Sequence, residues 1–238
     1  HKPLSILRQS EHDIIDAGHG WRMKDSPRDG LAVLIDDTVM TGNSFRDCLP
    51  TARERFPNLL TAALYVNPAA ALRPDIVVCD LPHPHWLAWN FANSVFSPHT
   101  ATDFDGVLCR DCLPHEDDDG PRYAEFLRTA TPLYCQRRCP IPLIVTARLE
   151  KYRQPTLDWL ARHGMSVKSL VMGPWKTNAE RARGDIAAFK AEHYRKFLKR
   201  HHQIKPPVFV ESDELQAKRI AELSGSLVIC PAVGKVFS

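Results

Sequence analysis

Short apolar runs separated by segments of helix length recur along the chain. In the first third, residues 31–35, 62–66 and 75–79 are such runs, and residues 44–56 have the apolar spacing of a helix. The runs are continuous rather than alternating, which is typical of parallel strands covered by helices on both faces. The pattern therefore predicts a parallel sheet with helices between its strands.

The same pattern continues in the rest of the chain. A strand is predicted to lead into Asp103, and others at 143–145, 169–172, 208–210 and 227–230. Helices are predicted at 121–129, 154–163, 186–200 and 215–223. Gly164 and Gly225 follow two of these helices, where glycine commonly ends a helix. The sequence thus predicts an α/β protein with two consecutive doubly wound parallel-sheet units.

The stretch between the two parts is unfavourable to helices. It contains Pro82, Pro84 and Pro98, and each proline removes a backbone donor and restricts the residue before it. We place the boundary here, with a first domain at 1–90 and a second at 91–238. The opening, 1–30, is polar, shows no clear pair of buried strands and begins with His1 rather than Met. We therefore expect the first domain to be truncated at its N-terminus.

Composition narrows the class of protein. The 238 residues are 44% hydrophobic and 25% charged, as in ordinary globular chains. No apolar stretch approaches the roughly 20 residues that cross a bilayer. A net charge of +3 is too balanced to indicate nucleic acid or an anionic membrane, so we expect small-molecule partners and leave a homo-oligomer open. Seven cysteines without a visible secretory signal favour free thiols in the reducing cytoplasm.

Two carboxylates and a small-residue loop follow the first predicted strand. Asp36 and Asp37 can accept hydrogen bonds from a pair of ribose hydroxyls. The loop can direct backbone N–H groups and hydroxyls at a phosphate on the positively polarised N-terminus of the next helix. Its polar and flexible positions are Thr38, Thr41, Gly42, Asn43 and Ser44. The alternative interpretation is a strand-end turn that only caps a helix.

This segment resembles the phosphoribosyl pyrophosphate (PRPP) loop of type I phosphoribosyltransferases, in which two acids precede a Thr-Gly-x-Ser turn. The resemblance covers residues 30–80. It implies that Asp36 and Asp37 hold the ribose hydroxyls and that residues 38–44 hold the 5-phosphate.

The second part carries four polar positions in order along the chain, three of them at strand ends. They are Asp103 with Asp105, then Thr146, then Lys190, then Glu211 with Asp213. Gly106 lets the chain turn sharply after the first pair, so that one acid can attack while the other donates a proton. The intervals between these positions are filled by the predicted helices and strands. They leave no room for a large cap domain, and we expect an open site.

Acid, hydroxyl, lysine and acid in this order is similar to the pattern of the haloacid dehalogenase superfamily, over residues 99–232. The resemblance implies a phosphohydrolase in which Asp103 is the nucleophile that forms an aspartyl-phosphate, and Asp105 is the acid and base. Thr146 would hydrogen-bond the transferring phosphoryl group, and Lys190 would offset its charge, although Lys196 and Lys199 share the predicted helix.

The same resemblance implies a magnesium ion. Its ligands would be Asp103, the main-chain carbonyl of Asp105, and Glu211 or Asp213, which are hard oxygen donors. The sequence Glu-Ser-Asp at 211–213 differs from the commoner Asp-Asp or Gly-Asp pair, so either acid can be the ligand.

Four cysteines, Cys109, Cys112, Cys135 and Cys139, have a spacing near that of zinc ligands. Cys109 directly follows the first motif, and three residues rather than two separate the second pair. We favour unpaired thiols, with a structural zinc site as the alternative.

Together these patterns predict an enzyme of nucleotide or nucleoside-like metabolism. It would join a PRPP-binding, phosphoribosyltransferase-like unit to a magnesium-dependent phosphatase. Two alternatives remain open. The first unit could be a regulatory sensor that binds PRPP without transferring it, or the whole chain could be an interaction module in which both sites are vestigial.

Overall fold

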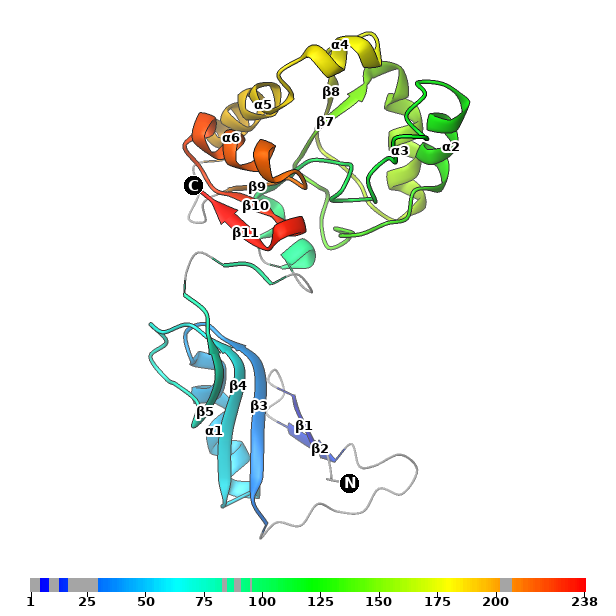
Figure 1. Cartoon of the computed structure of the whole chain (residues 1–238). Coiled ribbons are helices and arrows are strands. Elements are labelled where there is room, and N and C mark those ends of the chain that lie inside the picture. The colour runs from blue at the N-terminus through cyan, green and yellow to red at the C-terminus, as the bar shows by residue number, and fades with distance from the viewer. Residues whose placement is uncertain are drawn as a thin grey trace. The chain divides into compact units, whose positions relative to one another are not determined.

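A computed structural model describes residues 5–8, 13–16, 30–82, 85–87, 91–94, 96–201 and 207–238 (Figure 1). The chain divides into two compact units, His1–His85, here called unit 1, and Trp86–Ser238, called unit 2. This division falls a few residues before the boundary predicted at residue 90. Most of the polar opening lies outside the described residues.

Unit 1 is built on a parallel sheet of three strands in the order β3-β4-β5. The strands are β3 (Ala32–Val39), β4 (Leu59–Val66) and β5 (Ile76–Asp80), and helix α1 (Asn43–Arg55) joins the first two. Side chains of the helix and sheet, including Phe45, Leu49 and Val66, form a small core. A separate antiparallel pair, β1 (Ser5–Arg8) and β2 (Asp13–Asp16), was not predicted.

One face of the three-stranded sheet is exposed among the described residues. Burial alternates along β3, and Leu31, just before this strand, is 71% exposed. The large exposed apolar side chains around this sheet are Leu31, Val33, Ile35, Leu64, Ile76 and Val78. Among the described residues of unit 1, helix α1 packs against this sheet and buries the face that it contacts.

Unit 2 contains a six-stranded sheet in the order β11-β10-β9-β6-β7-β8. Its strands are β6 (Thr100–Thr102), β7 (Leu143–Leu149), β8 (Leu170–Gly173), β9 (Val208–Val210), β10 (Val228–Cys230) and β11 (Lys235–Phe237). All neighbouring pairs are parallel except β10 with β11, a strand that was not predicted. The predicted α/β class with two parallel-sheet units is confirmed.

Helices cover both faces of this sheet (Figure 1). Along β7, Leu143 and Val145 pack with helices α5 (Ile186–Arg200) and α6 (Glu214–Ser224). Ile144, which points to the other face, packs with α2 (Pro121–Thr129) and α3 (Arg153–Arg162). This alternation explains why the strand is a continuous apolar run, since both of its faces are buried.

The remaining elements are short. Helix α4 (Asn178–Arg183) was not predicted, and the 3-10 helices are η1 (Phe91–Asn93), η2 (Ser97–His99), η3 (Glu150–Tyr152) and η4 (Pro231–Val233). In the described ranges, no helix has the length and apolar character needed to cross a membrane.

The middle of the sheet positions the polar residues. Strand β6 lies between β9 and β7, and all three run in the same direction. Their carboxyl ends therefore meet at one edge, where parallel α/β sheets commonly bind ligands. Asp103 follows β6, Thr146 lies in β7, and Glu211 follows β9.

Candidate active site

A cavity of about 570 Å³ lies at this edge of the sheet, and its lining comes from unit 2 alone. The six residues predicted for the second site all line it: Asp103, Asp105, Thr146, Lys190, Glu211 and Asp213. Residues without a predicted role also line it, among them Asp111, Asp117, Tyr123, Arg148 and Arg181. The structure thus brings together positions that are spread over more than a hundred residues of sequence.

Lys190 is the central contact of the site. Its Nζ donates to Asp103 Oδ2 at 2.7 Å, to Glu211 Oε2 at 2.5 Å and to Gln216 Oε1 at 3.0 Å. All of its donors are therefore used, and its side chain is only 2% exposed. Lys196 instead pairs with Glu192 on the surface. Of the lysines considered on this helix, Lys190 is the one that reaches the cavity.

Burial and neighbouring charges shift the pKa values of Asp103 and Lys190. Burial raises the pKa of Asp103 to about 7 against the lowering effect of Lys190, and Glu211 and Asp105 raise it further. Burial disfavours the charged form of Lys190, but Asp103 and Glu211 outweigh this and raise the pKa of the ammonium. Lys190 therefore keeps its positive charge at neutral pH.

The turn after β6 depends on Gly106. This residue has a φ of +71°, and a Cβ at this position would overlap the side chain of Ser212. The close approach lets Ser212 Oγ donate to the main-chain carbonyl of Asp105 at 3.1 Å. Backbone contacts fix the start of the turn, because Asp103 N–H donates to the Val210 carbonyl at 2.9 Å. The turn that carries Asp103 and Asp105 is thus bonded directly to the segment that carries Glu211 and Asp213.

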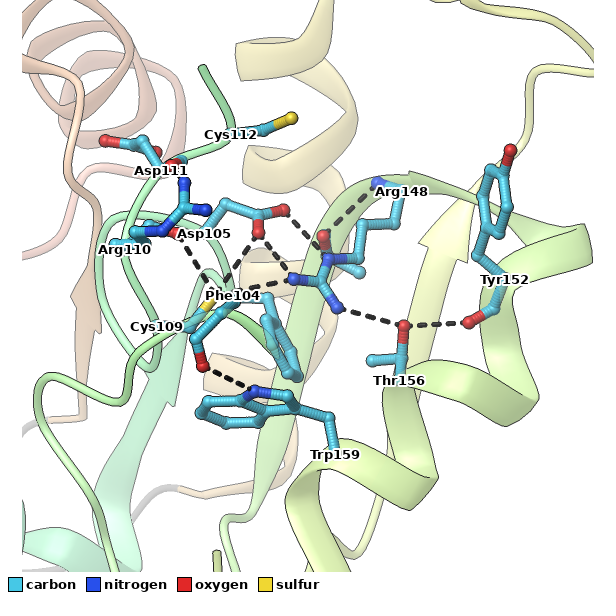
Figure 2. A network of polar contacts seen from close by, with 12 residues as sticks. Phe104, Asp105, Cys109, Arg110, Asp111, Cys112, Arg148, Tyr152, Thr156 and Trp159 are labelled. Atoms are coloured by element: carbon cyan, nitrogen blue, oxygen red, sulfur yellow. Dashed lines mark hydrogen bonds and ion pairs between the residues drawn. The ribbon is translucent and has the colours of Figure 1, made fainter. Parts of the chain in front are cut away.

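Arg148 holds the side chain of Asp105. Its Nε and Nη2 donate to the two carboxylate oxygens at 2.9 and 2.5 Å. Figure 2 shows the guanidinium between Asp105 and Thr156, and its carbon lies 3.8 Å from the centroid of the Phe104 ring. Arg148 is fully buried and Asp105 is 24% exposed, so the pair is largely shielded from solvent. The sequence contained a signal for it, since Arg148 follows Thr146 by two positions and side chains two apart in a strand start on the same side.

Thr146 lies inside a strand rather than at its end. Strand β7 continues to Leu149, with an irregular register between Val145 and Leu149, so the predicted end of this strand at residue 145 was wrong. The irregularity allows a buried residue to line the cavity. The Thr146 hydroxyl accepts the N–H of Arg148 at 3.2 Å and can still donate its own proton.

The donors suit a hard cation such as magnesium. The lining carries six carboxylates (Asp103, Asp105, Asp111, Asp117, Glu211 and Asp213) and three cationic side chains (Arg148, Arg181 and Lys190). In the described ranges, no three His, Cys, Asp or Glu side chains are grouped as a complete metal site. Magnesium does not need such a cage, because it commonly keeps several waters and takes only one or two carboxylates with substrate phosphates. The oxygen donors and the excess of negative charge therefore fit this ion.

The two acids of the fourth motif differ in their surroundings. Glu211 is buried, contacts Lys190 and accepts the N–H of Asp213 at 3.2 Å. Asp213 is the N-cap of α6, where its Oδ1 accepts the N–H of Gln216 at 2.8 Å. Each carboxylate retains acceptor capacity toward the cavity.

The four cysteines do not gather as a zinc site within the described part of the chain. Cys109 is buried and lies 3.4 Å from Asp105 Oδ1 and from Arg148 Nη2, and Cys139 accepts a contact from Gln136 at 3.5 Å. Burial raises the pKa of Cys109, and it raises the pKa of Cys112 to about 12. The observation that bears on a zinc site is therefore the spacing of these thiols, which the described residues do not bring together in a group of three.

In unit 1, strand β3 runs through both predicted acids to Val39. Asp36 is half-buried and Asp37 exposed; burial, followed by the neighbouring Asp37, raises the pKa of Asp36. The loop then turns through Gly42, which has a φ of +85° and leaves no room for a Cβ against the backbone of Leu72. Only glycine suits this turn.

The loop in unit 1 leaves donors free at a helix N-terminus. No acidic side chain lies in the first turn of α1, and Thr41, Asn43 and Ser44 are exposed. Thr38 Oγ1 is buried and has no hydrogen-bond partner among the described residues. The predicted phosphate-binding residues are thus close together around one turn, with unused donors.

Comparisons of this chain with protein-family models, with curated proteins and with solved structures find no match.

Proposed function

We propose that unit 2 is a magnesium-dependent phosphohydrolase that acts through an aspartyl-phosphate, as its resemblance to haloacid dehalogenase-type enzymes implies. The contact of Lys190 with both Asp103 and Glu211 is the observation that carries this proposal. It joins residues from three elements in one open cavity, although burying these charges is costly. Such an arrangement supports phosphoryl transfer, where catalysis rests on positioning and on charge stabilisation.

In the proposed reaction, a carboxylate oxygen of Asp103 attacks phosphorus and the bond from phosphorus to the leaving oxygen breaks. Asp105 gives a proton to that oxygen and then takes one from the water that hydrolyses the aspartyl-phosphate. Thr146 donates a hydrogen bond to the phosphoryl group, and Lys190 offsets its charge. Arg148 orients the Asp105 side chain, and its charge favours the ionised form of Asp105 that takes the proton from water.

The residues that would hold magnesium are Asp103, the main-chain carbonyl of Asp105, and Glu211 or Asp213. The ion supplies positive charge against the oxygens of the phosphoryl group. Ser212 supports this set, because its hydroxyl fixes the Asp105 carbonyl. With these ligands, the excess negative charge of the cavity is reduced before an anionic substrate enters.

Phosphate release from phosphomonoesters in the presence of magnesium tests this proposal. Asp103→Asn keeps the size of the side chain and removes the nucleophile, so we expect the rate to fall about 10³-fold or more. Asp158→Asn, an exposed change on α3, is the matched control and should keep the full rate. Full activity in the Asp103→Asn variant would exclude this residue as the nucleophile.

We further propose that unit 1 binds PRPP, either for transfer or as a sensor. The turn at Gly42 and the hydroxyl of Thr38, which has no hydrogen-bond partner among the described residues, support this by leaving donors beside Asp36 and Asp37. Calorimetry on the full chain should show PRPP binding that Asp36→Ala and Asp37→Ala each weaken about tenfold, the value of one hydrogen bond to a charged group.

Asp47→Ala on α1 is the control for the PRPP experiment and should bind like the unmodified chain. Release of pyrophosphate with a panel of bases then separates the two roles, since a transferase releases it and a sensor does not. Equal affinity in all variants would contradict a role for the acid pair.

A further inference from the structure

Tyr123 presents an unused hydroxyl at the cavity of unit 2. This residue of α2 lines the cavity and is only 3% exposed. Its ring is fixed by an edge-on contact with Tyr152, at 4.8 Å between centroids, and by a tilted contact with Phe126 at 5.7 Å. The hydroxyl forms no hydrogen bond with any residue that the structure describes. Burial, followed by the charge of Asp105, raises the pKa of Tyr123, so the phenol keeps its proton and is a donor.

Arg181 brings further donors to the same cavity. It lies on the short helix α4, and its Nη2 donates to Asp117 Oδ2 at 2.6 Å. This is the only hydrogen bond of the guanidinium group within the described ranges, which leaves its other N–H groups available. Asp117 Oδ1 is itself occupied, because it accepts from Asn178 at 2.8 Å. Asp117 therefore orients Arg181 and offers little to a second ligand.

The other two cations of the lining have no such capacity. Arg148 is committed to Asp105 and Thr156, and Lys190 is committed to Asp103, Glu211 and Gln216. Arg181 is also the cation near Tyr123 that is part-exposed, with a side-chain exposure of 20%. The unused groups of Tyr123 and Arg181 are donors, so a ligand that contacts both residues must supply acceptors. A hydrogen bond from these donors to an anionic oxygen is stronger than one to a neutral acceptor.

We propose that Tyr123 and Arg181 form a second anion subsite, which binds a carboxylate or phosphate on the part of the substrate that is not transferred. This inference rests on the phosphohydrolase function proposed for unit 2 and names its substrate class: phosphomonoesters with a second anionic group. In this proposal, Asp103 attacks the phosphoryl group and Lys190 offsets its charge. Tyr123 and Arg181 bind the part of the substrate that is not transferred. The two sets lie on different elements of one cavity.

Four aryl phosphates that share one ring test the subsite on the full chain. They are phenyl phosphate and its derivatives with a para carboxylate, a para phosphate or a neutral para hydroxymethyl group. We expect kcat/KM to be about 10- to 100-fold higher for the anionic derivatives, the range for one or two charge-assisted hydrogen bonds. The comparison of carboxylate with phosphate tells which anion the subsite prefers, and preference for the hydroxymethyl compound would overturn the proposal.

Three variants test which residues cause the preference for the anionic derivatives. Arg181→Gln should remove most of it through KM, and Tyr123→Phe should reduce it several-fold, because both variants lose more activity toward the anionic derivatives than toward phenyl phosphate. Arg183→Met is the matched control, because Arg183 is exposed on the same helix and does not line the cavity. An equal loss for all four substrates, or a preference that persists in Arg181→Gln, would overturn the subsite.

A binding measurement separates this inference from the proposed activity. 4-Carboxyphenylphosphonate cannot be hydrolysed, and calorimetry with magnesium reports its affinity whether or not the chain turns over phosphomonoesters. We expect about tenfold weaker binding in Arg181→Gln than in the unmodified chain or in Arg183→Met. If phosphomonoesters are not hydrolysed but this difference is found, the activity fails and the subsite stands. Equal affinity in all three, or no binding, overturns the subsite.

Discussion

Arg148 and Lys190 are both fully buried, and each contacts carboxylates rather than water. Their energetic role differs from that of the surface pairs of this protein. A buried pair gains little over an apolar replacement of both partners, yet loss of one partner leaves a charge without compensation. These residues therefore matter to stability as well as to the proposed chemistry.

Removal of Arg148 tests this at the level of one side chain. Arg148→Met leaves Asp105 without its partner, so we expect the free energy of unfolding in urea to fall by about 3 kcal/mol. Arg128→Met breaks an exposed pair with Glu125 and should cost less than about 1 kcal/mol. Similar losses in the two variants would show that the burial of Arg148 does not carry the effect.

The segment 110–120, which lies between the Asp103–Gly106 turn and α2, is held by several of its acidic side chains. We call it the acidic loop. Glu116 pairs with Arg110 at 2.6 Å, Asp117 with Arg181 at 2.6 Å, and Asp119 with Lys151 at 2.7 Å. Asp118 accepts the N–H of Tyr123 at 3.0 Å, at the start of α2. The loop thus connects both α2 and α4 to the cavity wall.

Acid should loosen this loop. Hydrogen bonds from Arg110 lower the pKa of Glu116 from 4.5 to about 2, and the backbone N–H of Tyr123 lowers the pKa of Asp118 from 3.8 to about 2. Because folding lowers both values, their stabilising effect is present above about pH 4.5 and is lost as the pH falls toward 2. NMR should show lower amide protection factors, corrected for the pH dependence of intrinsic exchange, in residues 110–120 over this interval.

The variant Glu116→Gln is the control for the acid experiment. It removes one of the two titrating anchors, so the loop should already exchange faster at pH 6 and change less on acidification. Amide protection that is constant from pH 6 to pH 2 in the unmodified chain would contradict the role of these carboxylates.

Two elements show what the local sequence pattern does not predict. Helix α4 has only six residues, too few for an apolar period to appear, yet it supplies Arg181. The run at 31–35 has the composition of a strand buried on both faces, but Val33 and Ile35 are exposed. Whether a second layer covers a sheet depends on distant parts of a chain, which local periodicity does not contain.

At the scale of the whole molecule, the sequence predicted both parallel sheets and one edge of the cavity. Asp103, Thr146 and Glu211 could be predicted to meet because the carboxyl ends of parallel strands lie together. Tyr123, Arg181 and Asp117 could not, because they reach the cavity from helices and a loop whose packing depends on tertiary contacts. The roles of all these residues stay predictions until the variants above are measured.

The position of β6 in the sheet has a consequence for folding. Thr100 pairs with Val208, roughly a hundred residues later in the chain, and Asp103 N–H is bonded to Val210. Contacts between segments so distant form late, because a long loop must close first. During synthesis, the turn that carries Asp103 stays incomplete until β9 has left the ribosome. The charged residues of the cavity therefore come together only once nearly all of unit 2 exists as a chain.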